Sequence, residues 1–141
     1  MRSGASKPDV GSTDTFKRAL IEAKSIAYAG EGAAGQYFIG VLDRLGIASE
    51  MKPKLKLIAG NPVGAILKGE ADVTVTNIPP IMAEPAVELA GSLPAELQNY
   101  ISYTAGVSST GKETGAAKAL INFFTSAPAA AVMKAKGVEP R

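Results

Sequence analysis

SIAYAGEGAAG, residues 25–35, is the stretch that decides the fold. Ser25–Ala29 predicts a short strand, and the small, glycine-rich residues Gly30–Gly35 predict a tight turn after it. A helix is expected directly after the turn, ending before Gly46 as the residue that follows its C-terminus. The apolar face of this helix has five members at helical spacing: Tyr37, Phe38, Val41, Leu42 and Leu45.

The same alternation of helix and strand continues on both sides of this stretch. Before it, Ser12 or Thr13 is suited to capping a first helix that carries Phe16, Leu20 and Ala23. After it, Lys54–Ala59 and Asp72–Thr76 predict two further strands. Between these strands we expect a short helix with Asn61 as its cap, Pro62 at its first position and Gly69 at its end.

The remainder of the chain predicts a mixture of strands and helices. Pro79 and Pro80 are expected to break regular structure, Ala86–Leu89 and Tyr100–Val107 are candidate strands, and Gly115–Thr125 and Ala129–Lys136 are candidate helices. The whole pattern predicts an α/β fold with a mostly parallel sheet flanked by helices. We expect one domain over residues 1–141, with a core lobe at about 8–107 and a C-terminal helical segment at 108–141.

Composition excludes several classes of function. The formal net charge is only +2 and is spread along the chain, which argues against a nucleic-acid partner. The chain has no His and no Cys, so the usual zinc, haem and iron–sulfur sites cannot form, and no cofactor or metal is expected. The commonest general base and the common nucleophile pairs are also missing. On this ground we expect the protein not to be an enzyme.

Two turns are candidate anion sites. Gly30–Gly35 leads into a helix whose first N–H groups lack partners, although a tight connecting loop is an equally good interpretation and Glu31 would repel an anion. Gly60–Val63 is a similar turn, for which an ordinary helix cap is the simpler interpretation. Because both turns follow parallel strands, we expect them to open at the same edge of the sheet and to converge on one crevice.

A third glycine-rich stretch resembles a phosphate-binding loop. Gly106–Lys112 matches G-x-x-x-x-G-K, but Glu113 stands where such a loop needs Ser or Thr to ligate magnesium. An exposed turn before the last helices is the preferred interpretation, and an enzyme acting on phosphates is the weaker alternative.

The ordered set of motifs resembles the periplasmic molybdate-binding protein family and its relatives among type II solute-binding proteins. The resemblance covers nearly the whole chain and rests on these stretches: Lys7–Asp9, Thr15–Leu20, Ser25–Tyr28, Gly35–Phe38, Gly69–Asp72, Gly91–Tyr100, Ala116–Phe123 and Ala129–Gly137. It implies one lobe of a type II periplasmic-binding-protein fold. It also implies an ABC-type uptake system, with a transporter membrane subunit as partner and a periplasmic location.

The resemblance also implies a ligand site for a small oxyanion such as molybdate or tungstate. Ala34 and Val63 match residues whose backbone amides contact the anion, and Asn77, after Thr76, replaces a tyrosine that is frequent in the family. Gly32, Ala33 and Gly35 complete the expected ligand-binding set around the start of the helix.

The family's first lobe has no counterpart in this sequence, and the N-terminal residues lack the apolar segment of a signal peptide. Two interpretations remain open. The chain is either one half of an oxyanion cleft, or a module that binds no ligand and self-associates through surface that the first lobe would cover. Apolar residues of the last helices would form the contact surface of such a homodimer: Leu120, Ile121, Phe123, Phe124, Val132 and Met133.

Overall fold

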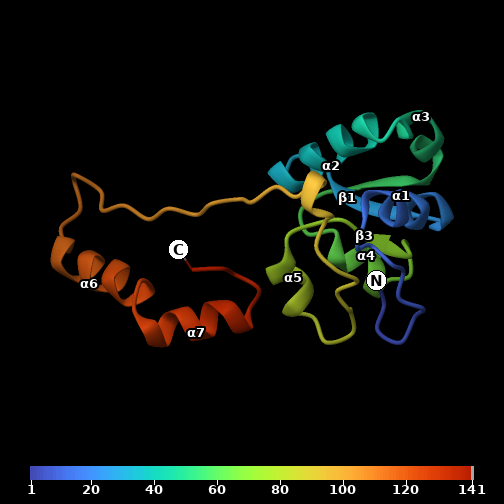
Figure 1. Cartoon of the computed structure of the whole chain (residues 1–141). Helices are drawn as coiled ribbons and strands as arrows, with labels where there is room; N and C mark the ends of the chain where they lie inside the picture. The colour runs from blue at the N-terminus through green and yellow to red at the C-terminus, as the bar shows by residue number, and fades with distance from the viewer. Residues whose placement is uncertain (141) are drawn as a thin grey trace. The chain divides into compact units, whose positions relative to one another are not determined.

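The computed structural model describes residues 1–140 and divides the chain into two units, Met1–Ile101 and Ser102–Arg141. The first unit is built on a parallel three-stranded sheet in the order β2-β1-β3 (Figure 1). The strands are β1 (Ile26–Ala29), β2 (Leu55–Ile58) and β3 (Val73–Thr74). The predicted α/β fold with a parallel sheet flanked by helices is confirmed.

Strand β1 is the centre of this sheet. Ile26 is in register with Leu55 of β2 on one side and with Val73 of β3 on the other. Because the strands are parallel, their carboxyl ends lie at one edge. The chain leaves β1 toward β2 and then crosses to the far side of β1 to form β3, which gives the open sheet a switch in strand order beside β1.

The two faces of the sheet carry different helices. Successive side chains of a strand point to opposite faces, and the neighbours Ile26 and Ala27 belong to two separate apolar clusters. Ile26 shares its cluster with α1 (Thr13–Glu22) and α2 (Ala33–Arg44), through Phe16, Leu20, Phe38, Val41 and Leu42. Ala27 shares the other cluster with α4 (Val63–Leu67). Helices α2 and α4 therefore cover opposite faces.

Most of the predicted helix boundaries are confirmed within a residue or two. Ser12 caps α1 by accepting a hydrogen bond from the Thr15 N–H at 3.2 Å. Gly46 follows α2 with a φ of +69°, a left-handed conformation that glycine adopts without strain. The cap of α4 is shifted by one position. Pro62 is the N-cap residue itself, and the Asn61 side chain accepts from the Val63 N–H at 3.1 Å.

The prediction that Pro79 and Pro80 break regular structure is wrong. Both residues lie inside α5 (Ile78–Met82), close to its N-terminus. The first turn of a helix does not use its N–H groups, so prolines are tolerated there. Three short elements were not predicted: α3 (Ala48–Met51), the 3₁₀ turn η1 (Lys52–Lys54) and the 3₁₀ turn η2 (Ala95–Leu97).

The two late candidate strands are not formed. Ala86–Leu89 contributes only an isolated antiparallel bridge between Arg2 and Val87, and Tyr100–Val107 has no regular structure. Next to this bridge the Glu88 N–H donates to the Met1 carbonyl oxygen at 2.8 Å. A strand needs a partner along its length, and the short segment at residues 1–3 is the only one that Ala86–Leu89 finds among the described residues.

The second unit, Ser102–Arg141, contains α6 (Thr114–Phe124) and α7 (Ala127–Ala135). Ser126 caps α7, and no residue of α6 is buried. Several large apolar side chains are exposed on these helices: Leu120, Phe123, Phe124 and Val132.

Within residues 1–140 no single helix has the length and apolar character to cross a membrane. Helices α6 and α7 meet those criteria only together, with a bend of 63° between them.

Candidate functional site

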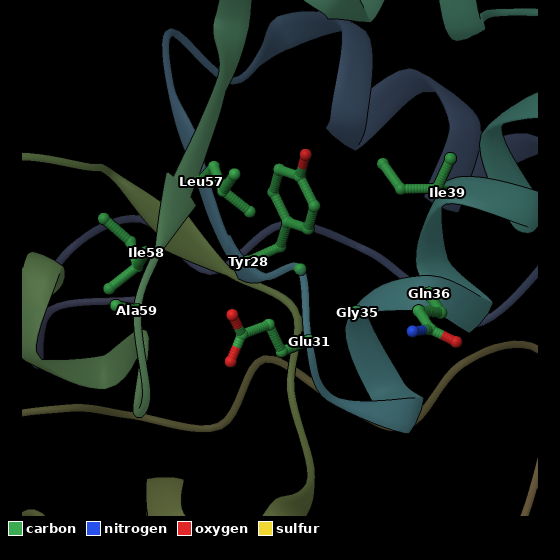
Figure 2. Close-up of a pocket in the computed structure, with 9 residues that line it drawn as sticks. Tyr28, Glu31, Gly35, Gln36, Ile39, Leu57, Ile58 and Ala59 are labelled. Atoms are coloured by element: carbon green, nitrogen blue, oxygen red, sulfur yellow. The ribbon is translucent and has the colours of Figure 1, made fainter.

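A hollow of about 660 Å³ opens at the carboxyl ends of β1 and β2, beside the start of α2 (Figure 2). The end of β1 and its turn contribute Tyr28, Gly30 and Glu31; α2 contributes Gly35, Gln36 and Ile39; the end of β2 contributes Leu57, Ile58 and Ala59. This is the edge at which open parallel sheets bind their ligands.

The start of α2 leaves backbone donors free at this hollow. Gly32 is the N-cap residue and has no side chain to accept from the helix, and the first helical hydrogen bond is donated by the Gln36 N–H to the Gly32 carbonyl oxygen. The N–H groups of Ala33, Ala34 and Gly35 have no acceptor among the described residues. Uncapped N–H groups and the positive end of the helix dipole favour an anionic group at this position.

Gly35 joins the first turn of α2 tightly to the end of β1. A Cβ atom at this position would lie 1.7 Å from the Ala29 carbonyl oxygen, far inside any real contact. The need for glycine at position 35 is therefore explained by packing between strand and helix. This observation favours the simpler interpretation of Gly35 itself, a tight connecting loop, and leaves the free N–H groups as the feature that suits a ligand.

Among the residues that the structure describes, Glu31 is the only charged one that lines the hollow. Its carboxylate has no hydrogen bond or ion pair within residues 1–140. Figure 2 shows this carboxylate between Ala59 and the start of α2, with the Tyr28 ring lying between Leu57 and Ile39. The Leu57 side chain is 67% exposed, which is unusual for a strand leucine and gives the hollow an apolar wall open to solvent.

The structure brings together only the α2 members of the predicted ligand-binding set. Gly35 lines the hollow, and Gly32, Ala33 and Ala34 form the turn that leads to it. Val63 does not line it: its residue is 2% exposed, its N–H donates to Asn61, and α4 lies on the other face of the sheet. Val63 is therefore not part of this hollow, and a crevice shared by Ala34 and Val63 stays a prediction.

Thr76 and Asn77 also lie outside the hollow. They follow β3, and Asn77 is the N-cap residue of α5 without a side-chain hydrogen bond to it. The apolar wall was not predicted from the sequence, because the pattern around Leu57 and Ile58 indicates only a strand. The signal available was their place at the end of β2, the edge at which the Gly30–Gly35 turn was already expected.

The comparisons with known proteins agree with this architecture. The family model described as "Bacterial extracellular solute-binding protein" matches residues 1–139. This chain belongs to that family. The solute-binding family accounts for the parallel sheet with its ligand edge, and it supports an extracellular or periplasmic location at the level of the family. The finer resemblance to molybdate-binding proteins is not established by this match.

One relative of this solute-binding protein is named aconitate isomerase and comes from Pseudomonas sp. It is 31% identical over 142 residues, which cover 99% of this chain and 54% of the relative. The chain thus spans about half the length of the curated relative it matches.

This relative overturns the prediction that the solute-binding protein is not an enzyme, because its name is that of an enzyme. The argument from missing His and Cys was too narrow. Carboxylates and phenols also transfer protons in active sites, and an isomerisation requires neither a nucleophile nor a metal in principle. Among residues 1–140 no group of three or more His, Cys, Asp or Glu residues is placed to hold a metal ion.

Proposed function

We propose that this chain provides one lobe of a binding site for a small organic acid of the aconitate type. In this proposal a carboxylate of the ligand accepts hydrogen bonds from the N–H groups of Ala33, Ala34 and Gly35, and its hydrocarbon part lies against Leu57. The observation that carries the proposal is the uncapped start of α2 at the ligand edge of the sheet.

The walls of the hollow support an organic ligand over a compact inorganic one. Tyr28, Ile39 and Leu57 present carbon to the hollow beside the start of α2. A tricarboxylate has both charged ends and a carbon skeleton to fill such a space, whereas a tetrahedral oxyanion has only oxygen. A compact oxyanion such as molybdate or tungstate is the alternative ligand, and the same titration includes molybdate and sulfate.

The proposal also includes a second lobe and a transporter. A two-lobed solute-binding protein closes around its ligand, and we propose that residues 8–107 act as one lobe of such a pair. Delivery to an ABC transporter membrane subunit in the periplasm remains part of this proposal, on the strength of the family match alone. The shared site is compatible with uptake of the acid and with its isomerisation.

An amide-resolved titration tests the binding proposal. The ¹⁵N-labelled chain is titrated with cis-aconitate, trans-aconitate, molybdate and sulfate, and shift changes are followed in ¹H–¹⁵N spectra. We expect aconitate to move the amide signals of Ala33, Ala34 and Gly35, while the amides of α1 stay in place. Shift changes confined to other segments would refute the site.

Substitution of Gly32 separates ligand binding from helix stability. The N-cap backbone angles, φ −87° and ψ 147°, suit an Asp side chain, and a Cβ there meets nothing closer than 3.9 Å. Gly32→Asp should stabilise α2 by a few tenths of a kcal/mol and weaken aconitate binding by about tenfold or more, because its carboxylate takes the donors. Gly32→Ala, which adds no acceptor, is the matched control and should retain binding. Equal affinity in both variants would contradict the proposal.

A homodimer is the second candidate role, and one specific observation favours it. The four large apolar side chains on α6 and α7 are 44–62% exposed. We propose that a second copy covers them, as exposed apolar patches commonly mark contact surfaces. Light scattering across a dilution series tests this, and a monomeric mass at every concentration would rule it out.

A further inference from the structure

We propose that Glu31 carries the proton in an allylic isomerisation of the bound acid. This inference rests on the proposed function, since it requires the ligand to lie in the hollow at the start of α2. Nothing in the names of the family or of the relative assigns a role to this residue.

Glu31 is the one side chain of the hollow that suits a base. Three polar side chains line the hollow: those of Tyr28, Glu31 and Gln36. A glutamate side chain is ordinarily ionised at neutral pH and can accept a proton. A tyrosine phenol is ordinarily protonated, and the amide of glutamine has no ionisable group, so neither serves as a base in this way. Glu31 is exposed, and its carboxylate makes no ion pair or hydrogen bond within residues 1–140, so no protein group described there competes with a substrate proton.

The position of Glu31 suits the same substrate that the backbone donors would hold. It directly precedes Gly32, the N-cap residue of α2, and its carboxylate lies in the hollow beside the helix start (Figure 2). A ligand carboxylate on the N–H groups of α2 would place the adjacent carbon atoms within the same hollow. The negative charge of Glu31 is unfavourable in a site that only binds an anion. A proton-transfer role explains the charge, because the base must be a carboxylate.

The chemistry of the step is balanced without a cofactor. Aconitate carries a CH₂ group next to its C=C bond, and the Glu31 carboxylate removes one proton from that carbon. The electron pair of the broken C–H bond forms a new C=C bond to the central carbon. The electron pair of the original C=C bond moves to its other carbon, which takes a proton from Glu31. The negative charge that develops between these steps spreads onto the ligand carboxylates, where the α2 N–H groups stabilise it. Glu31 is regenerated, and nothing is oxidised or reduced.

Solvent exchange and cis–trans conversion together provide the test. Glu31 is exposed, so the proton that it removes can exchange with D₂O before one is returned to the ligand. The 141-residue chain is incubated with trans-aconitate in D₂O, and ¹H NMR follows both the loss of the CH₂ signal and the appearance of cis-aconitate. We expect deuterium to enter the ligand in the presence of the chain. Glu31→Gln should lower this exchange about 100-fold or more, the usual contribution of a positioned acid or base, and Glu31→Asp should retain part of it. Glu50→Gln, at an exposed residue of α3, is the matched control and should exchange at the unsubstituted rate.

Binding by the same variants distinguishes failure of this role from failure of the site. Glu31→Gln removes a like charge beside the ligand, so its affinity for aconitate should rise, by up to about tenfold. Loss of exchange together with tighter binding supports the proton-transfer role. Binding at α2 with neither exchange nor cis–trans conversion, or either reaction surviving in Glu31→Gln, overturns the role and leaves the binding site standing. Absence of aconitate shifts at Ala33–Gly35 overturns both.

Discussion

The contact between Gly35 and β1 makes a sharp prediction about stability. Gly35→Ala places a Cβ atom 1.7 Å from the Ala29 carbonyl oxygen, where contacts closer than 3.0 Å essentially do not occur, so helix and strand must separate by at least 1.3 Å. The clashing atom, the Ala29 carbonyl oxygen, belongs to the backbone and cannot rotate away as a side chain could. Because Phe38, Val41 and Leu42 of the same helix are at most 1% exposed, such a shift also disturbs the main apolar cluster.

We expect Gly35→Ala to destabilise the protein by about 3 kcal/mol, at the upper end of the cost of overpacking. The matched control is Gly40→Ala in the same helix. Gly40 is exposed, and a Cβ there meets nothing within 4 Å. Alanine is favoured over glycine in a helix interior by about 1 kcal/mol, so this control should be stabilising. The same change of residue type thus has opposite signs at two positions five residues apart.

Urea unfolding followed by circular dichroism measures both variants, with stability obtained by linear extrapolation. In thermal unfolding, the expected loss for Gly35→Ala corresponds to a Tm lower by about 6–12 °C for a chain of this size. If Gly35→Ala loses less than about 1 kcal/mol, or if the two variants behave alike, the close approach of α2 to β1 is refuted.

Two further predictions concern local hydrogen bonds. Tyr37→Phe removes the phenol that donates to the Leu97 carbonyl oxygen at 3.0 Å and accepts from Arg44, and should cost about 1 kcal/mol in urea unfolding; an unchanged midpoint would contradict it. Ser12→Ala removes the cap of α1 and should also cost about 1 kcal/mol, whereas Ser12→Asp, another good N-cap residue, should retain the stability. Equal losses in both Ser12 variants would show that the cap is not the cause.

Local chemistry made the first half of the fold predictable from sequence. Ser12 as a cap, the strand ending at Ala29, and Gly46 as the residue after α2 each follow from the properties of a few neighbouring residues. The order of alternating helices and strands then leaves a parallel sheet as the natural arrangement.

Non-local pairing explains the errors in the second half. Ala86–Leu89 has the composition of a strand, but whether it forms one depends on a partner 80 or more residues away, and within residues 1–140 only Met1–Ser3 pairs with it. The expectation that Pro79 and Pro80 break regular structure is wrong for a different reason. Their tolerance depends on lying in the first turn of α5, and a boundary error of two residues reverses the expectation.

Local sequence predicts the uncapped start of α2, but it does not predict the face of the sheet on which α4 lies. The turn Gly30–Gly35 contains in itself the small residues and the uncapped helix start. Whether Val63 joins it depends on the face of the sheet that α4 covers and on the Asn61 side chain that takes its N–H. The Asn61 contact is local, but the face that α4 covers arises from the crossover of the chain around β1, which no local pattern encodes.

The close approach of Gly35 to Ala29 has a consequence for how this site can diversify. Any side chain at position 35 would push α2 away from β1, so the turn that carries the free amides cannot be remodelled by ordinary substitutions. Leu57 is under no such constraint, because it is mostly exposed and its side chain overhangs Gly30 from the neighbouring strand. New ligand preferences should therefore arise first at Leu57, and natural variation among relatives should concentrate on β2 while the β1–α2 turn keeps its shape.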